Sequence, residues 1–230
     1  SILFSDIAAT LQSGAPGQVA ALAGLSFVLV GIAFKFGAVP FHMWLPDVYE
    51  GAPTCVTLFV ATAPKVAAFA LALRVLVDAL GPVEADWRLI LTVFAVLSLA
   101  LGNLAAIVQS NIKRMLAYST IAHVGFILLG FIAGQGQGVQ SALYYTVIYV
   151  LMAAAAFGVV LLVAGSSDAD QLDDFRGLNR RAPWFALMML VVMVSMIGVP
   201  PFAGFYAKWW VLSALVDSGQ TWLAVVGVVF

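Results

Sequence analysis

The sequence contains very few charged residues. Only 9% of its 230 residues are Asp, Glu, Lys or Arg, whereas 63% are hydrophobic. A soluble domain carries roughly 25% charged residues, which it needs to face water. Most of the surface of this chain must therefore face something other than water. The net charge of −1 leaves no basic surface for nucleic acid.

Redox and metal-binding motifs are also missing. Cys55 is the only cysteine, which excludes an intrachain disulfide and a cysteine-cluster metal site. There is no G-x-G-x-x-G motif, phosphate-binding loop or bis-histidine haem pattern. We therefore predict that the chain itself holds no cofactor and no metal, and that it can move charge but cannot carry electrons.

Long hydrophobic runs are abundant. A transmembrane helix needs about 20 apolar residues, and six runs reach that length. They extend from about Val19 to Trp44, Cys55 to Leu80, Leu89 to Gln109, Met115 to Ala133, Val139 to Ala164 and Pro183 to Val216, and a seventh begins near Thr221. The predicted fold class is all-α, with one polytopic membrane domain over residues 1–230. Because the chain opens with Ser1 and stops inside an apolar run, we expect a fragment of a longer protein.

The short loops predict an orientation. The loops after the first, third and fifth runs lie on one side, and their basic residues are Lys113, Arg114, Arg176, Arg180 and Arg181. The other side has only Arg74 and Arg88, so the positive-inside rule makes the first side cytoplasmic. Lys113 and Arg114 are interpreted as topology and headgroup anchors. The acids Asp168, Asp170, Asp173 and Asp174 are interpreted as a solvated linker.

The first and sixth runs are too long for simple spans and contain helix breakers. The first includes Gly37 and Pro40, and the sixth includes the segment from Gly198 to Gly204. Proline removes a backbone donor, and unwound backbone at membrane depth survives only inside protein or beside water. We predict a break at Gly198 to Gly204, whereas Pro40 leaves a kink and a break equally open. The two runs cross in opposite directions, which is typical of an inverted repeat.

Four ionisable residues fall within the predicted spans at similar depth: Lys35, Lys65, His123 and Lys208. A lysine at the centre of a span costs about 2.5–3.5 kcal/mol, so function is the default interpretation. Burial disfavours a charged amine, and lysine, unlike arginine, can then lose its proton. The pattern predicts a proton relay along the membrane plane, aided by hydroxyls such as Thr62, Tyr118, Ser119, Thr120, Tyr145, Tyr149 and Tyr206. The alternatives are snorkelling for the lysines and an interhelical hydrogen bond for His123.

Several segments resemble a known family. Residues 34–53 read FKFGAVPFHMWLPDVYEGAP, residues 59–65 FVATAPK, residues 111–125 NIKRMLAYSTIAHVG and residues 198–208 GVPPFAGFYAK. These segments are similar to the proton-translocating, antiporter-like subunits of respiratory complex I, and within that family to the subunit N group. The resemblance implies an inverted-repeat fold in which this chain supplies the seventh helix to part of the thirteenth. The first and sixth runs would then be its two discontinuous helices.

The resemblance also implies roles and partners. Lys35 would pair with a glutamate on an earlier helix, Lys65 would be the central relay lysine, and Lys208 would lie near the outlet or the next subunit. His123 would belong to the central polar axis. The implied setting is a bacterial inner membrane, beside other complex I membrane subunits that include a neighbouring antiporter-like subunit. Flavin, iron–sulfur clusters and quinone would be bound by other subunits.

Two other interpretations stay open at this point. The same fold serves multisubunit cation/proton antiporters, although the Asp-Val-Tyr-Glu-Gly-Ala-Pro segment at residues 47–53 favours complex I. A membrane scaffold without transport is the third interpretation, which three lysines within spans disfavour.

Overall fold

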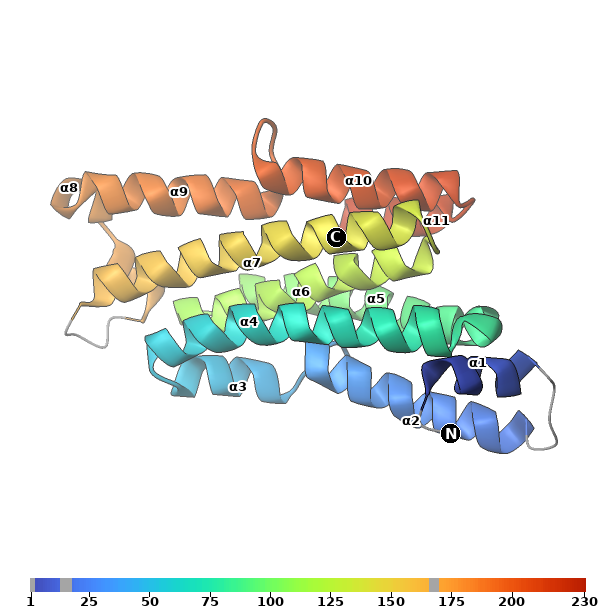
Figure 1. The fold of residues 1–230 in the computed structure, drawn as a ribbon. Helices are drawn as coiled ribbons and strands as arrows, with labels where there is room; N and C mark the ends of the chain where they lie inside the picture. Colours follow the sequence, from blue (N-terminus) through green and yellow to red (C-terminus); the bar gives the residue numbers. More distant parts are fainter. Residues whose placement is uncertain (1–2, 13–17, 166–169) are drawn as a thin grey trace.

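Four continuous helices form the centre of the molecule. The computed structural model describes residues 3–12, 18–165 and 170–230, and Figure 1 shows the helices running roughly side by side. The central helices are α4 (Thr54–Leu73), α5 (Glu84–Ile107), α6 (Ile112–Ile132) and α7 (Gln137–Ala164). The spans 54–79, 81–107, 112–132 and 137–164 are long and apolar enough to cross a membrane.

The other two predicted spans are discontinuous helices. The first consists of α2 (Gln18–Phe36) and α3 (Trp44–Gly51), and the second of α9 (Pro183–Ile197) and α10 (Ala203–Asp217). Pro40 therefore lies in a true break and not in a simple kink. The two discontinuous helices run in opposite directions (Figure 1), as the sequence predicted.

Short elements complete the described chain. They are α1 (Phe4–Gln12), the π-helical turn η1 (Arg74–Ala79), η2 (Gly81–Val83), η3 (Leu172–Phe175), α8 (Leu178–Arg181) and α11 (Thr221–Val229). Pro64 leaves α4 unbroken, because one missing backbone hydrogen bond is a small loss within a long helix that packs along α7. The irregular turn comes later, at η1.

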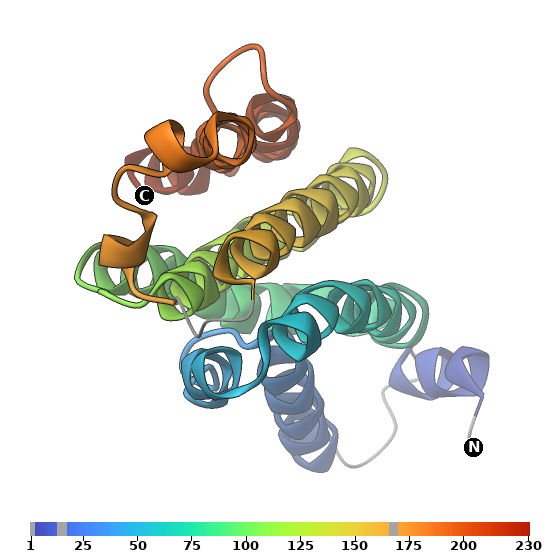
Figure 2. The same ribbon diagram turned by 90° about the vertical axis from the view of Figure 1, so that its left-hand side faces the viewer.

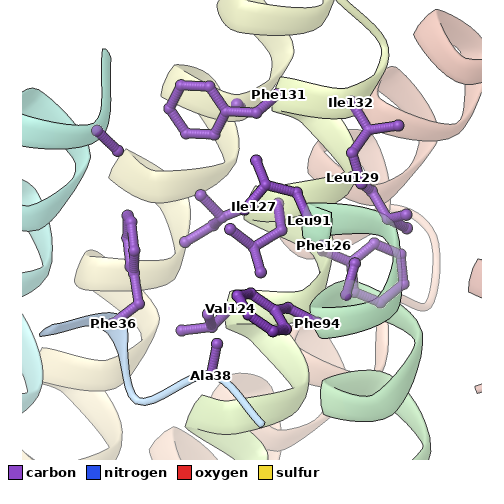
Figure 3. Packing of buried hydrophobic residues seen from close by; sticks show 14 of the residues in the cluster. Phe36, Ala38, Leu91, Phe94, Val124, Phe126, Ile127, Leu129, Phe131 and Ile132 are labelled. Carbon is purple, nitrogen blue, oxygen red and sulfur yellow. The ribbon is translucent and has the colours of Figure 1, made fainter. Parts of the chain in front are cut away.

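The core is centred on α6, whose residues are the most buried of all the spans. The α5 and α6 backbones approach closely at Gly102, where a Cβ atom would lie 2.6 Å from the Ala122 nitrogen. Phe36 and Ala38, beside the first break, share a hydrophobic cluster with Phe94 of α5 and residues of α6 (Figure 3). The start of the first break, residues 37–39, is therefore buried inside protein, whereas Pro40 and Met43 are exposed.

The connections α3–α4, α5–α6 and α7–α8 meet at one end of the bundle, which we call the loop end (Figure 2). Arg114 Nη1 lies 2.7 Å from Asp47 Oδ1 and 2.8 Å from Glu50 Oε2, and Lys113 Nζ lies 3.5 Å from Asp170 Oδ2. The interpretation of Lys113 as a headgroup anchor is therefore wrong, because this residue is buried beside Asp170. Arg114 pairs with two carboxylates of α3.

The interpretation of the acidic segment is also partly wrong. Asp170 is half-buried beside Lys113 and is not a freely solvated linker residue. Asp173 remains well exposed, paired with Arg176, and Asp174 caps η3. Asp168 lies outside the described residues.

Candidate functional site

The first break places a backbone carbonyl beside Lys65. Lys65 lies midway along α4 and is only 1% exposed, and its Nζ donates a hydrogen bond of 2.6 Å to the Phe36 carbonyl. Phe36 ends α2, so its carbonyl has no partner in its own helix. The negative end of the α2 dipole favours a cation at this point. The ammonium also lies 5.8 Å from the Trp44 ring centroid, within range of a cation–π interaction.

The unwound backbone of this break is held by a side chain. The Val39 amide donates a hydrogen bond of 2.9 Å to Ser98 Oγ on α5. Buried backbone donors need such partners, and at membrane depth they cannot rely on lipid. Ser98 therefore stabilises the segment that presents the Phe36 carbonyl to Lys65.

The second break repeats this arrangement with Lys208. Ile197 ends α9, and its carbonyl accepts a hydrogen bond of 3.0 Å from Lys208 Nζ. The ammonium lies 4.9 Å from the Phe126 ring centroid. A glycine with positive φ follows each acceptor, Gly37 with φ +75° and Gly198 with φ +91°. This backbone conformation ends each first half-helix and leaves its last carbonyl free for the amine.

His123 lies in the middle of α6 and is 5% exposed. Its Nδ1 lies 2.7 Å from the Tyr145 hydroxyl, and its ring centroid is 5.0 Å from that of Tyr149. If Tyr145 donates to Nδ1, the proton of the neutral ring is on Nε2, so this bond selects the tautomer. An interhelical hydrogen bond therefore exists here, and it leaves Nε2 available for a second partner.

A cavity of about 300 Å³ brings His123 and Lys208 together. It lies among α5, α6, α9 and α10, and its other polar lining groups include Asn103 and Ser119. The volume is enough for several water molecules at about 30 Å³ each, and polar groups are present to bind them. Water in this cavity would connect the imidazole to the amine.

Lys35 is placed differently from the other three residues. It is the penultimate residue of α2 and its side chain is exposed on the surface of the described chain. It directly precedes Phe36, whose carbonyl Lys65 contacts, and it forms no ion pair with any carboxylate among residues 3–12, 18–165 and 170–230. The structure thus groups Lys35 with Lys65, and His123 with Lys208. Within the described residues, these four side chains form no direct hydrogen bonds with one another.

Some of the hydroxyls that the sequence named lie inside the bundle, and one buried hydroxyl was not named. Tyr149 donates a hydrogen bond of 2.9 Å to Thr120 Oγ1, inside the bundle. Thr62 instead bonds to its own helix, at the Leu58 carbonyl, and Tyr206 is 53% exposed. The missed residue is Tyr49 on α3, whose hydroxyl is buried. Its sequence signal is its place in the segment 47–53, near the end of α3.

The fold and the site together define a class: a polytopic membrane protein whose two discontinuous helices offer backbone carbonyls to lysines. The family model for NADH:quinone oxidoreductase/Mrp antiporter transmembrane proteins matches residues 1–230. The chain belongs to that family.

Individual relatives agree with this assignment. NADH-quinone oxidoreductase subunit N of Thioalkalivibrio sulfidiphilus is 58% identical over 221 residues, which cover 96% of this chain and 46% of the relative. A chain of respiratory complex I from Thermus thermophilus is 40% identical with a TM-score of 0.76, over 90% of this chain and 45% of that one. A chain of the Mrp complex from Dietzia sp. is 25% identical with a TM-score of 0.87, over 100% and 42%. The chain thus spans about half the length of these proteins.

Proposed function

We propose that this chain is part of a proton-translocating membrane subunit of a bacterial NADH:quinone oxidoreductase, comparable to subunit N. Electron transfer through flavin, iron–sulfur clusters and quinone on other subunits drives it. The loop end faces the cytoplasm and the bundle lies in the inner membrane, beside a neighbouring antiporter-like subunit. Lys35, Lys65, His123 and Lys208 pass protons along the membrane plane. The relatives' names and the paired lysine–carbonyl contacts support this proposal.

The observation that carries the proposal is the environment of Lys65. Its ammonium is buried among helices and bonds to one neutral carbonyl, with no carboxylate partner among the described residues. Isolated burial disfavours the charged amine, whereas the carbonyl and the end of the α2 dipole favour it. These opposing effects bring the two protonation states close in free energy. A charge change at the neighbouring Lys35 can then shift the balance.

Replacement of the amine tests this role. In the assembled complex, reconstituted into vesicles, Lys65→Ala should lower the number of protons pumped per NADH oxidised. Val66→Ala, on the exposed side of the same helix, is the matched control and should pump normally. Wild-type pumping by Lys65→Ala would refute the relay.

A cation/proton antiporter subunit is the second candidate function, because the whole chain aligns with a chain of the Mrp complex at a TM-score of 0.87. Affinity purification from native membranes separates the two. Flavin- and iron–sulfur-containing subunits should accompany the protein if it belongs to NADH:quinone oxidoreductase, and their absence from an intact complex would favour the antiporter.

A further inference from the structure

Tyr49 carries a buried hydroxyl that stability does not explain. The residue is 0% exposed, and its ring packs 5.7 Å from that of Phe157 on α7. Its hydroxyl faces the Thr120 hydroxyl but forms no well-aligned hydrogen bond within the described chain. A buried polar group without a partner destabilises the folded state. Phenylalanine would fill the same space without this cost, so the oxygen calls for another explanation.

Toward the middle of the bundle, Tyr49 is followed by the hydroxyls of Thr120 and Tyr149, and Tyr149 lies beside His123. Thr120 Oγ1 donates to the Leu116 carbonyl at 2.8 Å and accepts from Tyr149 at 2.9 Å. A hydroxyl oxygen has two acceptor positions, so Thr120 can also accept from Tyr49. The Tyr149 ring in turn lies beside that of His123, tilted by 40° with ring centroids 5.0 Å apart.

A polar cavity of about 530 Å³ lies at the loop end, and its lining begins at Glu50, the residue after Tyr49. Glu50, Lys113 and Asp170 line this loop-end cavity, together with Leu161 of α7. Glu50 follows Tyr49 directly, and Leu161 lies one turn beyond Phe157, against which the Tyr49 ring packs. Tyr49 therefore stands in the chain directly before the cavity-lining residues 50–55, and its hydroxyl faces Thr120.

We propose that Tyr49, Thr120 and Tyr149 form a second branch of the relay, through which protons from the loop-end cavity reach His123. This proposal rests on the proposed proton-relay function. Each oxygen takes a proton from its outer neighbour and releases its own hydrogen to the inner one, so every hydroxyl is neutral before and after transfer. The hydroxyls then rotate back. In the structure Thr120 donates to the Leu116 carbonyl and Tyr149 donates to Thr120, so transfer begins when the O–H groups of Tyr49, Thr120 and Tyr149 all turn inward. His123 takes the last proton on its unprotonated ring nitrogen and becomes an imidazolium.

Tyr49→Phe in the assembled complex, with the full-length subunit, tests this branch. Pumped protons per NADH should fall, and the solvent deuterium isotope effect on turnover should change, because a transferring oxygen is lost. Thermal stability should stay the same or rise, because an unpartnered buried hydroxyl is removed. Tyr144→Phe is the matched control, since Tyr144 packs against Trp210 outside the hydroxyl line, and it should pump normally.

A second pair of variants separates proton transfer from packing. Thr120→Val keeps the shape and removes the oxygen, so it should lower pumping, whereas Thr120→Ser should preserve it. If both variants lose pumping equally, packing is the cause and the branch is refuted. Normal pumping by Tyr49→Phe, with a defect in Lys65→Ala, would overturn the branch and leave the relay intact. Normal pumping by both would overturn the relay as well.

Discussion

At the scale of single residues, each of two lysines is matched to one carbonyl group. Lys65 bonds to Phe36 and Lys208 to Ile197, and each acceptor is the last residue before a glycine with positive φ. The lysines were predictable, because charge is rare and costly inside apolar runs. The acceptors were not, since any residue carries a carbonyl and only the position of the break selects which one is free.

Gly198 provides a test at this scale. Its φ of +91° disfavours any side chain, and an added Cβ would lie 3.0 Å from Lys208 Cδ. Gly198→Ala should therefore lower the stability of the protein by about 1–2 kcal/mol and displace the ammonium from Ile197.

Thermal unfolding of the purified complex and proton pumping in vesicles measure the two effects. The control is Gly158→Ala, because Gly158 lies inside α7 with open space around its Cβ position. That change should be neutral or stabilising. Equal melting temperatures and equal pumping for the two variants would contradict the role assigned to Gly198.

At the scale of elements, the hydrophobic runs predicted the spans well, and their lengths identified the two that are discontinuous. The exact form of the first break was not predictable. Pro40 alone fits a kink or a break, and the outcome depends on Ser98, a residue of a different helix that supports the unwound backbone. The helix α1 was not predicted, because its nine residues are too few to form a membrane span.

The contact between α5 and α6 is set by glycine. At Gly102 a Cβ would lie 2.6 Å from the Ala122 backbone nitrogen, whereas at Gly125 the nearest atom is a side-chain carbon of Leu99, at 2.8 Å. A side chain can reorient but a helix backbone cannot, so Gly102→Ala should destabilise the protein more than Gly125→Ala. Overpacking of this kind costs about 1–3 kcal/mol.

Melting temperatures of the two variants, with Gly158→Ala as reference, should therefore rank Gly102→Ala lowest. Pumping should also fall in Gly102→Ala, because Ala122 precedes His123 and a displaced α6 moves the imidazole away from Lys208. A melting temperature for Gly102→Ala at or above that of Gly125→Ala would show that the helices are not in backbone contact.

At the scale of the whole molecule, the described chain has a loop end rich in ion pairs and a largely hydrophobic interior that holds a few polar groups. The loop end gathers Lys113, Arg114 and their carboxylate partners, whereas Lys65 and Lys208 contact carbonyls at the two breaks. The sequence placed the basic loops on one side correctly. It could not show that Lys113 is buried, because a loop residue next to a span looks the same whether it meets lipid or protein.

The orientation across the membrane follows from the same loops and can be tested with the single cysteine. Cys55 is exposed at the loop end, which the positive-inside rule assigns to the cytoplasm. In a full-length subunit with Cys55 as its sole thiol, a membrane-impermeant maleimide should label it in inside-out vesicles and not in right-side-out vesicles.

Gln135 is exposed at the opposite end, between α6 and α7, so Gln135→Cys in a Cys55→Ser background should show the reverse pattern. Labelling of both sites from one side would mean that the two ends do not face opposite compartments. Exchange of the two patterns would invert the proposed orientation, and protons would then enter the loop-end cavity from outside the cell.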